Sequence, residues 1–463
     1  METVIILVFV FGYLAITLEH NIKIDKLIPA LVMMAISWAL ISLGIDDFSQ
    51  WFDSAKHSLM DNFGLLPHKE KMHLMEETLL HHLGKTAEIL VFLLGAMTIV
   101  EIIDYFDGFS TIKSAVKFNS RKKLLWMFAI LAFVLSAIID NLTATIVLIS
   151  ILQKIVKDRD IRIWYAGLII IAANAGGAWS PIGDVTTTML WIGDKVSTGK
   201  LFIYLFIPSL LCMIVPTFIA SLLKPFKGDL ELQPDDDKVK NKFSSTMLFL
   251  GLGAIVFVPI FKVITHLPPY VGMMLSLGVV AVFAEIYSNS KFAISAADQG
   301  EHQAHASHSP VHYSLSKIEL PSILFFLGIL MAVAALESLG ILFGFAGNLK
   351  ESVGLIGTEP AGTVVSDLVV ILLGIGSAVI DNVPLVAASL GMFDQALDDQ
   401  LWHFIAYSAG TGGSMLIIGS AAGVVAMGME KIDFFWYLKK ISWLALVGFI
   451  AGALAFMVTR GLF

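Results

Sequence analysis

One short stretch occurs twice in this chain, as Ser136-Ala137-Ile138-Ile139-Asp140-Asn141 and, almost unchanged, as Ser377-Ala378-Val379-Ile380-Asp381-Asn382. Both copies lie in the middle of apolar segments. A carboxylate surrounded by hydrocarbon is costly, so acids within membrane segments mostly face a cavity or a partner and carry function. Matching acids in two halves of a chain predict a duplicated fold with one shared site, as in secondary transporters.

The repeat extends beyond these hexapeptides. Asn174-Ala175-Gly176-Gly177 follows the first copy at about the distance at which Gly410-Thr411-Gly412-Gly413 follows the second. Upstream, Phe92–Gly95 matches Phe325–Gly328, and each leads at the same spacing to an acid. These acids are Asp104 and Glu337. The correspondences predict two structural repeats.

The composition is that of a membrane protein. Of the 463 residues, 57% are hydrophobic and 15% charged, whereas apolar residues make up about 45–50% of soluble proteins. Apolar runs long enough to span a bilayer, about 20 residues, recur along the whole chain. They are continuous rather than alternating, which predicts helices and excludes an outer-membrane barrel. A net charge of −8 gives no cue for nucleic acid, and the single cysteine, Cys212, excludes an intramolecular disulfide.

Four apolar runs are too long for one plain helix, and Asp, Gly or Pro interrupts each near its middle. Interrupted segments at corresponding positions of two halves indicate a transport site. The sequence therefore predicts an all-α polytopic membrane protein with two inverted repeats, re-entrant helical hairpins and discontinuous transmembrane helices. The predicted spans are 3–18, 26–44, 87–104, 123–156, 161–192, 200–224, 245–264, 269–288, 318–341, 363–397, 400–430 and 434–459, of which 123–156, 161–192, 363–397 and 400–430 are interrupted.

The predicted organisation has four parts. These are N-terminal spans with an amphipathic external segment (1–86), the first repeat (87–224), a linker with two spans and a His-containing loop (225–317), and the second repeat (318–463). If 123–156 and 363–397 are re-entrant, most of the 30 basic residues fall on one face, which should be cytoplasmic. The first hairpin then opens to the cytoplasm and the second to the outside. The loop at 288–317 is either a solvated linker or a metal or pH-sensing element, and its histidines are His302, His305, His308 and His312.

The two hairpin acids are the first candidates for ion binding. At facing hairpin tips, Asp140 and Asp381 would meet across the repeat axis, and a small hard cation takes oxygen ligands such as theirs. A cation and a proton that compete for one carboxylate have coupled fluxes. The other interpretation is that each acid only caps the half-helix after it. The predicted cation- and proton-binding residues are Asp140, Asn141, Thr143, Asn174, Asp184, Thr186, Thr187, Ser377, Asp381, Asn382, Thr411 and Ser414.

The break at 174–188 carries an acid that its counterpart lacks. Ser420 stands where the first half has Asp184, and Gly410 stands where it has Asn174. The predicted site is therefore asymmetric, and Na⁺ is expected at Asp140, Asp184 and Asp381. The alternative is a packing break whose hydroxyls bond back to the helix.

Several further acids lie near the ends of spans. Glu101, Asp104 and Glu337 are candidate proton-relay groups, with simple interfacial placement as the alternative. Glu88, Glu285 and Asp367 are expected to face water. No phosphate loop, zinc-protease motif or nucleophile elbow is present, so neither an enzyme nor a cofactor is expected.

The segments 92–104, 136–145 and 174–187 resemble NhaD-type sodium/proton antiporters. Their superfamily also contains arsenite permeases and sodium-coupled dicarboxylate carriers. The resemblance implies Na⁺ and Li⁺ export in exchange for protons across a bacterial inner membrane, by a homodimer with a moving transport domain in the lipid bilayer. It places the ion site at the residues predicted above, Thr143 excepted. In the dicarboxylate branch the hairpin tips read Ser-Asn-Thr, whereas this chain has Asp140 and Asp381 in place of Ser and Pro384 in place of the second Thr.

Two other functions remain open at this point. The nearer alternative is an anion, organic-acid or arsenite permease of the same fold, although Lys and Arg are missing from the four breaks. The other is a membrane protein that transports nothing. It would tolerate the loss of the paired acids.

Overall fold

The computed structural model describes residues 1–18, 22–53, 58–60, 62–113, 120–229, 242–298, 309–345, 365–379 and 382–462. Within these ranges the chain is almost entirely helical. Seven of the described helices are long and apolar enough to cross a membrane, which confirms the predicted all-α polytopic architecture. Asp381, His302, His305 and His308 lie outside the described residues.

The N-terminal region consists of two helices, a small hairpin and one long helix. Its elements are α1 (Glu2–Thr17), α3 (Leu27–Leu43), η1 (Ile45–Asp47), β1 (Phe52–Asp53), β2 (Ser58–Leu59), η2 (Phe63–Leu65) and α4 (His68–Tyr105). The strands pair antiparallel, with Phe52 opposite Leu59. The predicted boundary between residues 86 and 87 falls inside α4, because residues 68–86 are mostly strong helix formers that continue into the span.

The next segment contains two of the predicted interruptions. Its elements are α5 (Ser110–Lys113), α6 (Arg121–Ile139), α7 (Asn141–Ile155), α8 (Arg159–Gly177), α9 (Val185–Ile192), α10 (Thr198–Leu222) and η3 (Lys224–Phe226). The first break falls at Asp140, between α6 and α7, and the second spans residues 178–184. Asp158 begins α8 by accepting a hydrogen bond from Asp160 N, as an N-cap does.

The central segment is more helical than the sequence predicted. It contains α11 (Ser244–Thr265), α12 (Pro269–Asp298), α13 (Pro310–Lys317) and α14 (Leu320–Ser338). The segment 288–317, which was predicted to be a loop, is therefore helical at both ends. At its start, α12 continues past the apolar span to Asp298, and at its end the chain forms α13. His312, the one loop histidine that the structure describes, lies in α13.

The last segment repeats the interrupted pattern. Its elements are α16 (Asp367–Gly376), α17 (Asn382–Met392), α18 (Gln400–Gly412), η4 (Gly413–Met415), α19 (Ala421–Glu430), α20 (Phe434–Lys440), α21 (Ser442–Thr459) and η5 (Arg460–Leu462). The predicted span 434–459 is divided at Ile441 into α20 and the long α21.

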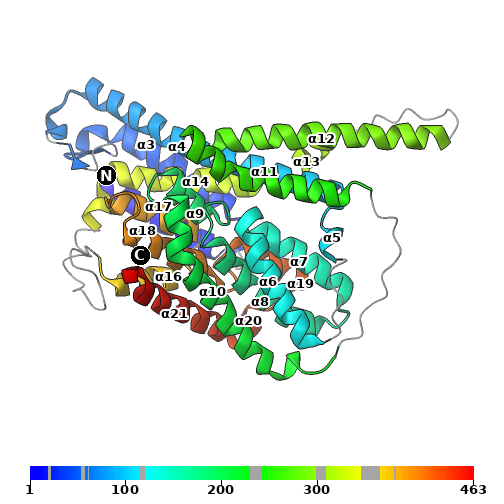
Figure 1. The fold of residues 1–463 in the computed structure, drawn as a ribbon. Helices are drawn as coiled ribbons and strands as arrows, with labels where there is room; N and C mark the ends of the chain where they lie inside the picture. Colours follow the sequence, from blue (N-terminus) through cyan, green and yellow to red (C-terminus); the bar gives the residue numbers. More distant parts are fainter. Residues whose placement is uncertain are drawn as a thin grey trace.

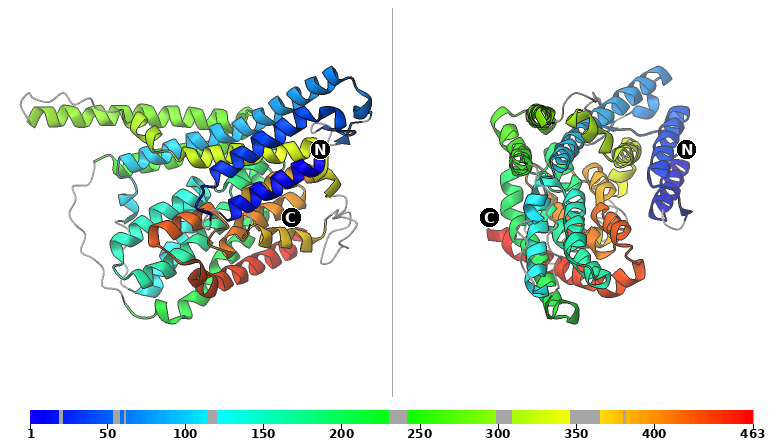
Figure 2. Two further views of the ribbon diagram at one scale, coloured as in Figure 1. Left: turned by 180° about the vertical axis from the view of Figure 1, so that it is seen from behind. Right: turned by 90° about the vertical axis from the view of Figure 1, so that its right-hand side faces the viewer.

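The interrupted helices lie side by side beneath a layer of long helices (Figures 1 and 2). Figure 1 shows α4, α14, α11 and α12 along one side of the molecule, with α6, α7 and α8 toward one end and α16, α17 and α18 toward the other. In α8 every residue from Tyr165 to Gly177 is buried. The breaks therefore lie in the protein interior, where irregular backbone at membrane depth is tolerated.

Candidate functional site

The two halves use the same hydroxyl contact just before each hairpin tip. Ser136 Oγ donates to Ala173 O at 2.6 Å and so ties α6 to α8. Ser377 Oγ lies 3.4 Å from Ala409 O and makes the matching contact between α16 and α18. The repeated sequence thus places the same side chain at the same helix–helix contact in both halves.

Glycine permits an equally close approach in both halves. A Cβ on Gly176 would lie 2.2 Å from Phe133 O, and one on Gly412 would lie 2.0 Å from Gly374 O. Real Cβ atoms do not come this near a carbonyl oxygen, so only glycine fits. The glycines of the two breaks therefore bring a helix end against the helix before the hairpin tip.

After each break a helix begins at an extended residue. Asp184 starts α9 with φ −151° and ψ 147°, and Ser420 starts α19 with φ −148° and ψ 152°. The two residues occupy the same backbone position, as their alignment predicted. The first half thus has a carboxylate where the second has a hydroxyl.

Polar side chains from both halves converge on Asp184, which is only 3% exposed. Asn141 Nδ2 donates to Asp184 Oδ1 at 3.2 Å, and Asn382 Nδ2 donates to Oδ2 at 3.2 Å. Thr186 Oγ1 also donates to Oδ2. Residues that follow the two hairpin acids therefore meet at a third acid, because α7 and α17 both begin beside the start of α9.

A second set of hydrogen bonds joins the site to Ser420. Asn141 Nδ2 also donates to Asn174 Oδ1, and Asn174 Nδ2 donates to Ser420 Oγ, each at 3.0 Å. The same Oγ accepts from Gly423 N at 3.3 Å and so caps α19. The sequence did not predict Ser420 as a site residue, although its alignment with Asp184 was a sufficient signal.

Asp140 takes the capping role that was the alternative interpretation. Thr143 donates to both of its carboxylate oxygens, from N at 2.7 Å and from Oγ1 at 2.9 Å. However, Asp140 has φ 75° and ψ 159°, a backbone region that is essentially restricted to glycine and costs about 1–3 kcal/mol for other residues. Capping alone does not favour an acid at such a strained position. Its counterpart Asp381 lies outside the described residues.

The remaining predicted hydroxyls bond to nearby backbone carbonyls. Thr187 Oγ1 donates to Asp184 O at 2.9 Å, and Thr411 Oγ1 donates to Tyr407 O at 2.6 Å. Ser414 Oγ donates to Thr411 O, and Ser377 Oγ to Gly374 O, each at 2.7 Å. These contacts match the packing interpretation of the breaks. The described predicted residues thus divide into a group around Asp184, the Asp140–Thr143 pair, and hydroxyls that support the helix ends.

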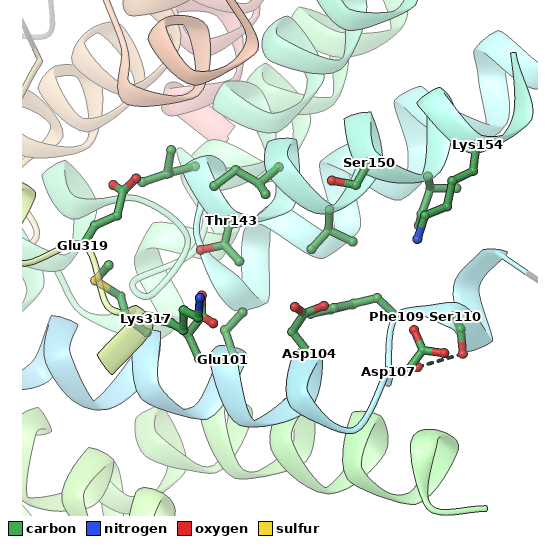
Figure 3. A pocket seen from close by; sticks show the side chains of 16 residues that line it. Glu101, Asp104, Asp107, Phe109, Ser110, Thr143, Ser150, Lys154, Lys317 and Glu319 are labelled. Atoms are coloured by element: carbon green, nitrogen blue, oxygen red, sulfur yellow. Dashed lines mark hydrogen bonds between the residues drawn. The ribbon is translucent and has the colours of Figure 1, made fainter. Parts of the chain in front are cut away.

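A cavity of about 180 Å³ reaches the Asp140–Thr143 pair (Figure 3). We call it the first cavity. Glu101 and Asp104 line it from α4, and Thr143 and Ser150 face them from α7. Its full lining is Met97, Val100, Glu101, Asp104, Asp107, Phe109, Ser110, Leu142, Thr143, Ile146, Val147, Ser150, Ile151, Lys154, Lys317 and Glu319. Two of the three candidate relay acids therefore share one polar space next to a hairpin tip.

The two halves contact each other at the C-terminal ends of α19 and α9, the helices that follow the second break of each half. Glu430, at the end of α19, has a fully buried side chain and accepts from Arg162 Nε at 3.0 Å. At the corresponding end of α9, Asp398 N donates to Lys195 O at 2.9 Å, and Lys195 Nζ donates to Gln395 O at 3.4 Å. The contacts are reciprocal in position, although only the first contains a buried ion pair.

Asp367 does not face water as predicted. It is 3% exposed, and Arg460 binds it with Nη1 at 2.6 Å from Oδ1 and Nη2 at 2.7 Å from Oδ2. The prediction was wrong because the partner arginine comes from η5 at the far end of the second repeat. Among the described residues there is no group of three or more His, Cys, Asp and Glu side chains that could hold a metal ion.

The fold and the site together define a class of protein. Long apolar helices surround two interrupted helix pairs, and buried amides and a carboxylate meet at the interruptions. This is the organisation of a secondary transporter, in which broken helices line a binding site within the membrane.

Comparison with known proteins identifies the family. The profile of a citrate transporter family matches residues 7–402. Sodium/proton antiporter 1 of Arabidopsis thaliana is 40% identical over 98% of this chain and 72% of its own length, and sodium/proton antiporter 2 of the same plant is 36% identical over 98% and 99%. The Na⁺/H⁺ antiporter NhaD of Vibrio parahaemolyticus is 33% identical over 78% and 87%. This chain belongs to the NhaD-type sodium/proton antiporters, within the family that the citrate transporter profile describes. Its relatives are named as transporters, in agreement with the prediction that it is not an enzyme.

Proposed function

We propose that this chain is a secondary active transporter that exports Na⁺, and also Li⁺, in exchange for protons. Cation and proton compete for the acids Asp140, Asp184 and Asp381. The observation that carries the proposal is the position of Asp184, which is 3% exposed and accepts hydrogen bonds from amides of both halves. Relatives named sodium/proton antiporters support the same cargo.

The amides around Asp184 suit a small cation. An asparagine that donates through Nδ2 keeps Oδ1 as an acceptor, and Asn141 and Asn382 both donate in this way. Carboxylate and amide oxygens are the ligands that hard cations take. When the cation leaves, a bare carboxylate at this depth is costly, so a proton takes its place. The exchange of charge at one group couples the two fluxes.

We further propose that the two halves are inverted repeats with re-entrant hairpins, α6–α7 and α16–α17. The shared serine and glycine contacts support the duplication. The boundaries of the four predicted parts, the homodimer and the bacterial inner membrane stay predictions, since the relatives include both plant and bacterial proteins.

Everted membrane vesicles with an imposed pH gradient provide the test. A fluorescent pH probe should report collapse of the gradient on addition of NaCl or LiCl. The variants Asp140→Asn, Asp184→Asn and Asp381→Asn should each lower exchange by about 100-fold, or about 2.7 kcal/mol, at normal expression. Asp160→Asn, at an exposed acid in the first turn of α8, is the matched control. Wild-type exchange in all three variants would overturn the site.

The same vesicles test the alternative of an anion carrier. Citrate or another dicarboxylate should leave the gradient unchanged, because the four breaks carry acids and amides and no Lys or Arg. Gradient collapse on citrate addition without a response to Na⁺ would reverse the proposal.

A further inference from the structure

A second cavity, of about 300 Å³, lies apart from the first. Glu337 lines it from α14, and Ala387 and Leu390 line it from α17. Lys85, Lys195 and Asp394 add charged side chains to its lining. The third candidate relay acid therefore has a polar space of its own, which the proposed site does not use.

The repeat relates the two cavities residue by residue. Counted from the matching glycines Gly95 and Gly328, the α4 residues that line the first cavity correspond to the α14 residues that line the second. These are Met97, Val100, Glu101 and Asp104 in the first cavity and Leu330, Val333, Ala334 and Glu337 in the second. Counted from Asn141 and Asn382, Ile146 corresponds to Ala387, and these two also line the first and second cavities.

The acid of the second cavity points toward α17, the helix that follows the second hairpin tip. A Cβ added to Gly391 would lie 3.1 Å from Glu337 Oε2. Gly391 corresponds in the repeat to Ser150, which lines the first cavity. Both cavities are thus bounded by equivalent faces of equivalent helices.

The second cavity lies beside the middle of α4 and the first beside its C-terminal end. This helix lines the second cavity with residues 82–89 and the first with residues 97–104, and at about 1.5 Å per residue these stretches are about 12 Å apart. The order is reversed at α14, where Lys317 and Glu319 before the helix line the first cavity and Leu330–Glu337 near its end line the second. Because α14 is long and apolar enough to cross the membrane and runs from the first cavity to the second, the two cavities lie at opposite ends of this helix.

We propose that the second cavity is a water-filled access path on the membrane face opposite the first, and that Glu337 is the acid at which a cation enters it. The inference rests on the proposed cation exchange, to which it adds a route. The first cavity serves the Asp140 side of the site and the second serves the α17 side. Two lysines line each cavity, but the two paths differ in their acids. The first is lined by Glu101, Asp104, Asp107 and Glu319, and the second by Glu337 and Asp394.

Cysteine labelling tests the two paths directly. Cys212, the single cysteine, is 1% exposed and is replaced in a Cys212→Ala background. Ser150→Cys then reports on the first cavity, and Leu390→Cys on the second. Lys157→Cys and Gly199→Cys, both exposed, mark the two faces near each cavity. Leu454→Cys, on the exposed apolar side of α21, is the control for a lipid-facing position.

A small charged thiosulfonate is applied to vesicles of either orientation. Ser150→Cys should react from the face that labels Lys157→Cys, and Leu390→Cys from the face that labels Gly199→Cys. Leu454→Cys should not react. The inference is overturned if Leu390→Cys does not react from either face or shares a face with Ser150→Cys. Labelling requires no exchange, so absent Na⁺ exchange with correct labelling would overturn only the proposed cargo.

Glu337→Gln tests the role of the acid. It should raise the half-saturating Na⁺ concentration by about tenfold when Na⁺ is supplied at the face that carries Gly199. Tenfold is the low end of the range by which charged clefts raise the association rate of an ion of opposite charge. Glu101→Gln, in the first cavity, should affect supply from the other face. An equal effect of Glu337→Gln from both faces, or no effect, would remove Glu337 from the path.

Discussion

The two halves of the chain carry different residues at one matched backbone position. Asp184 and Ser420 begin equivalent helices with nearly the same φ and ψ. Asp184 accepts hydrogen bonds from Asn141 and Asn382, whereas Ser420 accepts from Asn174 and Gly423 N. The two halves therefore share the backbone conformation at this position, but only the first half places a carboxylate there.

Exchanging these two residues is the severest test of the comparison. Asp184→Ser should abolish Na⁺-dependent gradient collapse in vesicles, because it removes the carboxylate to which Asn141 and Asn382 donate hydrogen bonds. The double variant Asp184→Ser/Ser420→Asp should stay inactive, since of the three site amides only Asn174 reaches position 420. Recovery of exchange in the double variant would show that the two positions are interchangeable.

The two contacts between the halves, Arg162 with Glu430 and Lys195 with Gln395, should contribute very differently to the free energy of unfolding. Arg162→Ala leaves the Glu430 carboxylate buried without its ion partner, which typically costs about 3–5 kcal/mol. The melting temperature in detergent should fall clearly. Arg162→Met/Glu430→Met should recover much of the loss, because no charge is then buried alone. Lys195 Nζ donates to Gln395 O at 3.4 Å and lies 4.9 Å from the centroid of the Trp402 ring. Lys195→Ala should therefore melt closer to the wild type than Arg162→Ala does, because it leaves no buried charge without its partner.

Alanine in place of the break glycines should destabilise both halves alike. Gly176→Ala and Gly412→Ala each place a Cβ against a carbonyl oxygen, and such overpacking costs about 1–3 kcal/mol. Gly428→Ala, where nothing lies within 4 Å of the added Cβ, is the matched control in α19. Thermal melting of the purified variants checks the order. Equal melting of all three would contradict the close helix contact.

Ser420 should have the mildest effect. Ser420→Ala removes a helix cap, at about 0.5–2 kcal/mol, and releases the Asn174 amide. We expect the half-saturating Na⁺ concentration to rise by about tenfold, or about 1.4 kcal/mol, while the maximal rate is nearly unchanged. Ser420→Thr keeps the hydroxyl and should restore affinity. If Ser420→Thr behaves like Ser420→Ala, the hydroxyl does not orient Asn174.

Local sequence signals predicted the breaks but not the contacts across them. Asp140 and the glycines at 176 and 177 mark interruptions, because Asp favours the start of a new helix and Gly weakens a helix interior. That α4 continues back to His68 was missed, since an amphipathic segment and a span can join without any stop signal. The Asp367–Arg460 pair and the approach of Asn382 to Asp184 depend on distant segments meeting, which spacing along one helix cannot reveal.

The hydrogen bond between Asn382 and Asp184 can form only late in the synthesis of the chain. These residues are 198 positions apart, so at about 5–20 residues per second the ribosome needs roughly 10–40 s between them. During that interval the first half stands in the bilayer with only part of its polar centre. Asn382 of the second half has not yet been made and cannot donate to Asp184. A nascent chain, or one truncated before residue 382, therefore lacks this contact between the halves.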